Sequence, residues 1–150
     1  MITLEVPTFV MLPRKTMEDK KINCNLNDYR NLNFRVLSAA KNAFYIKFKP
    51  EMDRVKEEFD NLIQSQVLFY RKIFNIEFEP VFRLNYMITA QNKKAFDIAN
   101  FLPIIQKYAD DCLVKDLFFE DDNFNFITEV NYKFGGITGE RKCTLGIELI

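Results

Sequence analysis

Residues 97–126 read DIANFLPIIQKYADDCLVKDLFFEDDNFNF, and they predict a helix that connects two strands. Apolar residues recur at helical spacing through Phe101, Leu102, Ile105 and Leu113, so we expect a helix from about Ile98 to Lys115 with this side in the core. Asp97 precedes the helix, and Glu120, Asp121 and Asp122 follow it in a tight connection. Acidic residues therefore stand at both ends of one helix.

Strand patterns flank this helix. Residues 80–90, PVFRLNYMITA, alternate so that Phe82, Leu84, Tyr86 and Ile88 share one face of a strand. Alternation resumes at residues 124–133, a glycine turn follows, and residues 143–150, CTLGIELI, predict the last strand.

The segment before residue 80 predicts one more strand and two helices. Residues 2–7 predict a short strand, and the polar, basic residues 11–31 predict a long loop. Helical periodicity starts near Leu32, and Pro50 is expected to break or kink the helix and begin a second one. The order of elements predicts an α+β, α/β-like fold in which one mixed β-sheet of about four strands packs against three helices.

Composition limits the possible functions. The 150 residues suit one domain, and 48% hydrophobic residues with 16 Phe predict a packed core. Lys and Arg together number 21, as do Asp and Glu, so no net charge attracts nucleic acid or membrane; separate basic and acidic regions still allow DNA binding. Histidine is absent, and the three cysteines are irregularly spaced, which excludes His-dependent triads and favours a reducing, cytoplasmic location. No apolar run reaches about 18 residues, so we expect no membrane span.

The acidic residues around the predicted helix have two interpretations. On a helix, Asp97, Asn100, Lys107 and Asp111 lie near one face. Asp97 is then an ordinary N-cap, and Lys107 and Asp111 an ordinary exposed pair. Alternatively, Asp122, which is in phase with the predicted buried face of the next strand, lies close to Asp97, and both bind one divalent cation. Oxygen ligands without His or Cys indicate Mg²⁺, with Mn²⁺ as a substitute.

The same residues resemble a known family. Asp97-Ile-Ala-Asn100, followed by Lys107, Asp111 and Glu120-Asp121-Asp122-Asn123, is similar to the signature of RusA-type Holliday-junction endonucleases, which bacteriophages and prophages carry. That signature is roughly D-x-D-N, a helix with Lys and Asp, and a turn ending in D-D-[SN]. Residues 25–31, NLNDYRN, resemble an early segment of the family.

The resemblance implies a single RusA-like endonuclease domain over residues 1–150. It implies a homodimer in the host cytoplasm, without a small-molecule cofactor, that resolves branched DNA with Mg²⁺. Asp97, Lys107 and Asp122 would be catalytic; the metal ligands would be Asp97, Asp122, Asp111 and Asp121. DNA contacts would come from Arg14, Lys15, Lys20, Lys21, Asn25, Arg30, Lys93 and Lys94.

The chain departs from the signature at two positions. Ala99 replaces the second Asp of D-x-D-N, which removes one expected ligand, and Pro103 stands where the family has its Lys. Asp111 or Glu129 would replace the lost ligand. The alternative is a DNA-binding dimer of the same fold that cuts weakly or not at all; another is an interaction protein with a solvated acidic turn.

Overall fold

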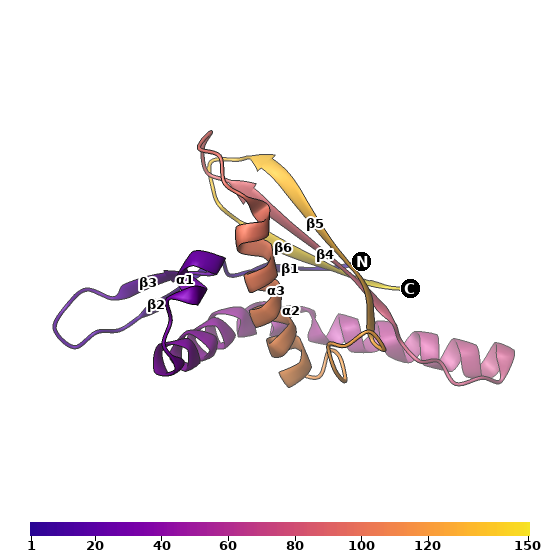
Figure 1. Ribbon diagram of the computed structural model, residues 1–150. Helices are drawn as coiled ribbons and strands as arrows, with labels where there is room; N and C mark the ends of the chain where they lie inside the picture. The colour runs from indigo at the N-terminus through magenta and orange to yellow at the C-terminus, as the bar shows by residue number, and fades with distance from the viewer.

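The computed structural model describes residues 1–150 and contains one mixed four-stranded sheet (Figure 1). Its strands are β1 (Ile2–Val6), β4 (Phe82–Ala90), β5 (Ile127–Ile137) and β6 (Cys143–Leu149), in the order β1-β6-β4-β5. β4 and β5 are parallel, and the other pairs are antiparallel. The predicted α+β fold with one mixed sheet is confirmed.

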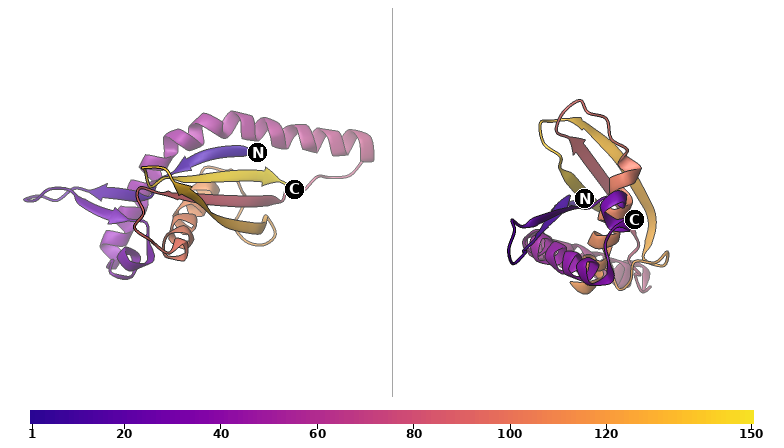
Figure 2. Two further views of the ribbon diagram at one scale, coloured as in Figure 1. Left: turned by 90° about the horizontal axis from the view of Figure 1, so that it is seen from above. Right: turned by 60° about the vertical axis from the view of Figure 1, so that its left-hand side comes forward.

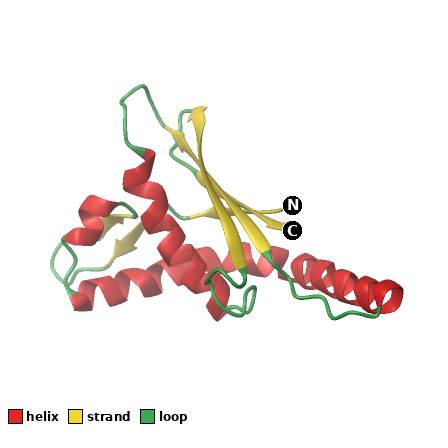
Figure 3. Cartoon of the chain, turned by 45° about the vertical axis from the view of Figure 1, so that its right-hand side comes forward, coloured by secondary structure: helices red, strands yellow, loops and turns green.

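Helices cover one face of this sheet (Figure 3). They are α1 (Leu26–Arg30), α2 (Phe34–Phe74) and α3 (Ile98–Lys115), and α3 has the predicted bounds. Alternate residues of the strands, such as Leu4, Leu84, Tyr86 and Leu145, are buried beneath the helices. They belong to a single cluster of 30 buried apolar residues. No helix combines the length and the apolar character needed to cross a membrane.

Residues 11–31 differ from the predicted loop. β2 (Phe9–Leu12) and β3 (Lys20–Asn23) form a separate antiparallel hairpin that extends away from the sheet, and α1 follows it (Figure 1). Val10 and Ile22, which face each other across the hairpin, are buried in the core. Val10, Ile22 and the partly buried Leu12 anchor the hairpin to the core, although the loop that connects its strands is mostly polar.

Pro50 does not end the first long helix. α2 is 41 residues long and continues through Pro50 without a break. Its far end extends past the sheet (Figure 2, left). Pro50 is exposed, while Phe48 and Met52 on either side are buried. Packing on both sides of Pro50 thus outweighs the one backbone hydrogen bond that proline removes.

The strand after α3 begins later than predicted. β5 starts at Ile127, and Phe124, expected on its buried face, is 80% exposed. Residues 121–126 form turns, so Asp122 is not in phase with a buried strand face. The predicted alternation of buried and exposed residues is therefore not observed, because only Ile127 of β5 is buried.

Candidate functional site

The N-terminal end of α3 lies beside a basic hollow at the end of the sheet. β4 ends at Ala90 and its parallel neighbour β5 at Ile137, and these residues are partners in the sheet. The turn after Ala90 leads into α3, whose N-cap is Asp97. Ligands of α/β proteins commonly bind where parallel strands end, so this edge is a natural place for a site.

Three cations from separate segments line the hollow, which has a volume of about 420 Å³. Lys21 comes from β3, Lys94 from the turn after β4, and Arg141 from the turn before β6. The amide side chains of Asn23, Gln91 and Asn92 also line it, and Glu140 is its one acid. This lining suits a phosphate or another oxyanion.

Aromatic rings orient two of the cations. The guanidinium of Arg141 lies 4.8 Å from the ring centre of Phe96 and 4.5 Å from that of Phe101. The Nζ of Lys21 lies 4.5 Å from the ring centre of Phe9. Such contacts hold flexible side chains in place without neutralising them. Arg141 is not among the residues predicted from the sequence; the basic pair Arg141-Lys142 after the glycine turn was the available signal.

A second hollow, of about 400 Å³, adjoins the first on the other side of the turn. Asp97 lines it, together with Lys93 and Lys94 and the apolar side chains of Phe96, Phe134 and Ile137. Asp97 itself acts as the predicted ordinary N-cap, because its Oδ1 accepts a hydrogen bond of 2.9 Å from the Ala99 N–H. The backbone N–H of Asn100 donates a hydrogen bond of 2.9 Å to the Asp97 carbonyl.

The other predicted DNA contacts are spread over the surface. Arg14 and Lys15 lie near the tip of the β2–β3 hairpin, Lys20 lies on β3, and Arg30 is the last residue of α1. Asn25 is buried and caps α1 through its side chain, so it is not part of the basic hollow. Of the eight predicted residues, Lys21 and Lys94 line the first hollow, and Lys93 and Lys94 line the second.

The second half of α3 carries a group of carboxylates. Asp110 is buried, and it accepts hydrogen bonds from the Tyr86 hydroxyl at 2.7 Å and the Gln106 side-chain amide at 3.0 Å. Burial, reinforced by the nearby charges of Asp122 and Asp111, raises its pKa to about 6. Asp110 is not among the residues predicted from the sequence, although an acid so close to the buried Ala109 and Cys112 was a signal.

Asp122 belongs to the same group. Its pKa is raised by burial, by a hydrogen bond with Asp121 and by the charges of Asp111 and Asp121. Asp121 also accepts hydrogen bonds from the Asp122 backbone N–H at 2.7 Å and from the Asn123 side chain at 3.0 Å. We call Asp110, Asp111, Asp121 and Asp122 the acidic end of α3.

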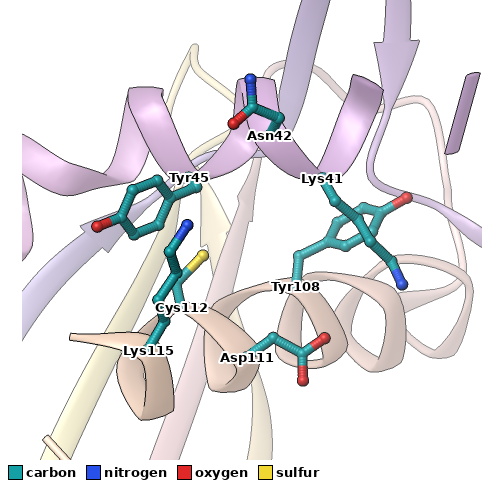
Figure 4. Close-up of a pocket in the computed structure, with 7 residues that line it drawn as sticks. All are labelled: Lys41, Asn42, Tyr45, Tyr108, Asp111, Cys112 and Lys115. Carbon is teal, nitrogen blue, oxygen red and sulfur yellow. The ribbon is translucent and has the colours of Figure 1, made fainter. Parts of the chain in front are cut away.

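Asp111 projects at the mouth of a hollow of about 240 Å³ between α2 and α3 (Figure 4). Lys41 and Lys115 line this hollow as well, with Tyr45, Tyr108 and Cys112 between them. Lys107 is exposed one turn earlier, with its Nζ 5.2 Å from the ring centre of Tyr29 on α1.

The structure does not bring Asp97 and Asp122 together within one chain. Fourteen residues of helix separate Asp97 from Asp111, which is about 21 Å at the helical rise of 1.5 Å per residue. Asp122 lies at the Asp111 end, since the two charges interact. Lys107 is likewise about 15 Å along the axis from Asp97. No group of three or more Asp, Glu or Cys side chains is arranged to hold a metal ion, so the predicted cation site is not assembled by a single copy.

A comparison with models of known protein families finds no match, and neither does a comparison with curated proteins. The resemblance to RusA-type resolvases therefore depends on the residues quoted above. The geometry adds a basic edge around the N-terminus of α3 and an acidic end near its C-terminus.

Proposed function

We propose that the protein binds DNA of the branched kind that resolvases recognise, through the basic hollow at the edge of the sheet. The observation that supports this most directly is that Lys21, Lys94 and Arg141 converge there from three separate segments. Cations that converge on a concave surface bind successive phosphates of a nucleic acid backbone. A chain without net charge then binds through a local field rather than a global one.

Neighbouring features extend this surface. Lys93 and the half-exposed ring of Phe134 border the second hollow, so a base that has left its stack has an aromatic partner beside the phosphate contacts. The exposed cations of the hairpin, Arg14, Lys15 and Lys20, lie beyond the first hollow for a longer duplex. A branched DNA offers both duplex phosphates and bases that are easily unstacked.

The test is fluorescence anisotropy with a labelled four-way junction, a linear duplex and a single strand at several salt concentrations. We expect Lys94→Glu combined with Arg141→Glu to raise the Kd more than about tenfold and to lower the salt slope by roughly two. Lys72→Glu, at the far end of α2, is the matched control and should leave the Kd nearly unchanged. Absence of binding at low salt, or an equal loss in the control, would reject the proposal.

A second candidate function is Mg²⁺-dependent cleavage of such DNA. It is favoured by the four carboxylates at the acidic end of α3, none of which forms an ion pair with a lysine or an arginine. The donor set of one copy does not fit a shared cation between Asp97 and Asp122, so no hydrolytic step is assigned to a single copy. We expect Asp97→Asn and Asp122→Asn each to abolish Mg²⁺-dependent cutting of a junction while binding persists; normal cutting by both would reject these residues as catalytic.

A further inference from the structure

The face of the sheet that points away from the helices is open (Figure 3) and holds a hollow of about 340 Å³. Asn85 and Met87, which line it, alternate along β4 with buried residues that face the helices. No residue of this hollow also lines the basic hollow at the end of the strands. Its volume is at the lower end of the range of small-molecule sites, roughly 300–1,000 Å³.

A series of hydrogen bonds across three strands fixes one amide of this hollow. Arg83 on β4 forms an ion pair of 2.9 Å with Glu148 on β6. The pKa of Glu148 is lowered first by its hydrogen bond with Arg83 and also by one from Asn85, so the amide nitrogen of Asn85 faces this carboxylate. The amide oxygen of Asn85 in turn accepts a hydrogen bond of 2.9 Å from the side-chain nitrogen of Asn131 on β5. Asn131 is thereby held with its amide oxygen free and with a second N–H to donate.

An amide that offers an acceptor beside a donor matches one edge of adenine. Asparagine accepts a hydrogen bond from adenine N6 and donates one to N7, whereas guanine offers two acceptors, O6 and N7, at the same edge. Such a pair of hydrogen bonds discriminates between bases by about tenfold or more. Asn131 presents this donor and acceptor to the hollow, and Asn85 is the positioning residue that holds it.

Two thioethers give this polar face the apolar surface that a base needs. Met1 lies over Gly146 and Met87 lies over Gly135, because a Cβ at either glycine would overlap the methionine side chain. The two glycines are therefore what allows both methionines to lie against the sheet. Contacts between sulfur and an aromatic ring are favourable, and a bicyclic purine makes more of them than a pyrimidine does.

Lys133 is the one cation that lines the hollow, and it forms no ion pair. It follows Asn131 by two residues on β5, so it lies on the same face at roughly 6.6 Å along the strand, which places its ammonium within reach of the 5′-phosphate of a nucleotide whose base lies on Asn131. Arg83 on β4 and Lys142 beside β6 are already paired with glutamates. One free cation suits a single phosphate, whereas the successive phosphates of a strand need several.

We propose that the open face of the sheet binds one adenine nucleotide, with Asn131 reading the base and Lys133 holding the 5′-phosphate. The base rests on the thioethers of Met1 and Met87. This site does not depend on the proposed DNA binding, because the nucleotide uses none of the cations of the basic hollow.

NMR titration of ¹⁵N-labelled protein measures the Kd and locates the ligand. The ligands are AMP, GMP, CMP and ribose 5-phosphate, and we expect AMP to bind about tenfold or more tightly than the other three. The side-chain amide signals of Asn85 and Asn131 should shift with AMP. Absence of AMP binding at about 1 mM, or equal affinity for all four ligands, would overturn the proposal.

Three variants separate the contacts to the base and to the phosphate. Asn131→Asp keeps the size of the side chain but replaces the donor, so it should raise the Kd of AMP and of uncharged adenosine about tenfold or more. Lys133→Met should raise the Kd of AMP and leave that of adenosine nearly unchanged. Asn85→Ala should reduce the preference for AMP over GMP, which a loss of stability alone would not do. Asn61→Asp, on the exposed side of α2, is the matched control for the change of charge. Variants that melt like the wild type and bind AMP and adenosine equally well would overturn the assignment of these residues.

A further variant separates this site from the basic hollow. Lys94→Glu combined with Arg141→Glu should retain AMP binding, while Asn131→Asp should leave the Kd for a four-way junction nearly unchanged. Loss of AMP binding in the double variant would place the nucleotide in the basic hollow and overturn this proposal, but not the proposed DNA binding. An adenine-only hexanucleotide that binds the double variant about tenfold more tightly than AMP would also overturn it, because the occupant would then be a strand.

Discussion

The two ends of α3 use the same residue type in opposite ways. At the N-terminal end, Asp97 accepts a hydrogen bond from the Ala99 N–H, its charge interacts favourably with the helix dipole, and Lys93 and Lys94 lie nearby. Near the C-terminal end, the charges of Asp111 and Asp122 help to raise the pKa of Asp110, and those of Asp111 and Asp121 help to raise the pKa of Asp122. Whether a charged aspartate stabilises the fold therefore depends on the hydrogen-bond donors and the charges that surround its carboxylate.

Asp116 lies beside the acidic end but, unlike its four members, has a cation as a partner. Asp116, the C-cap of α3, accepts a hydrogen bond of 2.6 Å from the Tyr45 hydroxyl, and Lys49 lies 3.2 Å away. Asp110 has Tyr86 and Gln106 as donors, but no cation. Asp110 is therefore the acid of α3 whose ionisation should change the stability of the fold most.

The largest expected effect is the pH dependence of stability at Asp110. Its folded pKa of about 6 lies above the ordinary 3.8, so the folded state holds the proton more tightly. This stabilising contribution is complete below about pH 3.8 and is lost as the pH rises through 6, a change of about 3 kcal/mol. Asp110→Asn should remove this part of the profile, as measured by urea unfolding between pH 4 and 7.5.

Asp97→Asn is the matched control for that experiment. Asparagine caps a helix about as well as aspartate, and Asp97 is exposed. Its pH profile should follow the wild type. A profile of Asp110→Asn that also follows the wild type would show that Asp110 is charged in the folded protein near pH 5.

A smaller effect is expected at the N-cap. Asp97→Ala leaves the Ala99 N–H without its partner and should lower the free energy of unfolding by about 1 kcal/mol, whereas Asp97→Ser should retain most of it. Urea unfolding at pH 7 measures both. An alanine variant as stable as the serine variant would mean that the cap hydrogen bond contributes nothing in solution.

The sequence predicted those elements whose apolar periodicity is strong. α3, β4 and β6 were predicted closely because residues such as Phe101, Tyr86 and Leu145 mark one continuous buried face. The β2–β3 hairpin and α1 were missed because their core contacts reduce to a few residues, including Val10 and Ile22, within a polar segment. The predicted break at Pro50 was wrong, because packing on both sides of this residue keeps α2 continuous where local preference favours a break.

The candidate site was harder to predict than the fold. That Asp97 caps α3 follows from local sequence, and the interpretation as an ordinary cap is confirmed. Its convergence with Asp122 within one chain was wrong because an 18-residue helix keeps its two ends apart. Arg141 joins Lys21 and Lys94 through sheet topology, which places the turn before β6 beside the end of β4, and composition carries no information on that placement.

The smallest expected effect comes from neutralising one exposed member of the acidic end. The charge of Asp122 contributes to the raised pKa of Asp110, so Asp122→Asn should lower the pKa of Asp110 toward its ordinary value. The change in the free energy of unfolding should be only a few tenths of a kcal/mol, because exposed charges interact weakly. NMR titration of the Asp110 carboxyl carbon measures the pKa directly, with Asp60→Asn on α2 as the control. If Asp110 titrates identically in both variants, the charge of Asp122 does not contribute to the pKa of Asp110, and these two carboxylates do not interact.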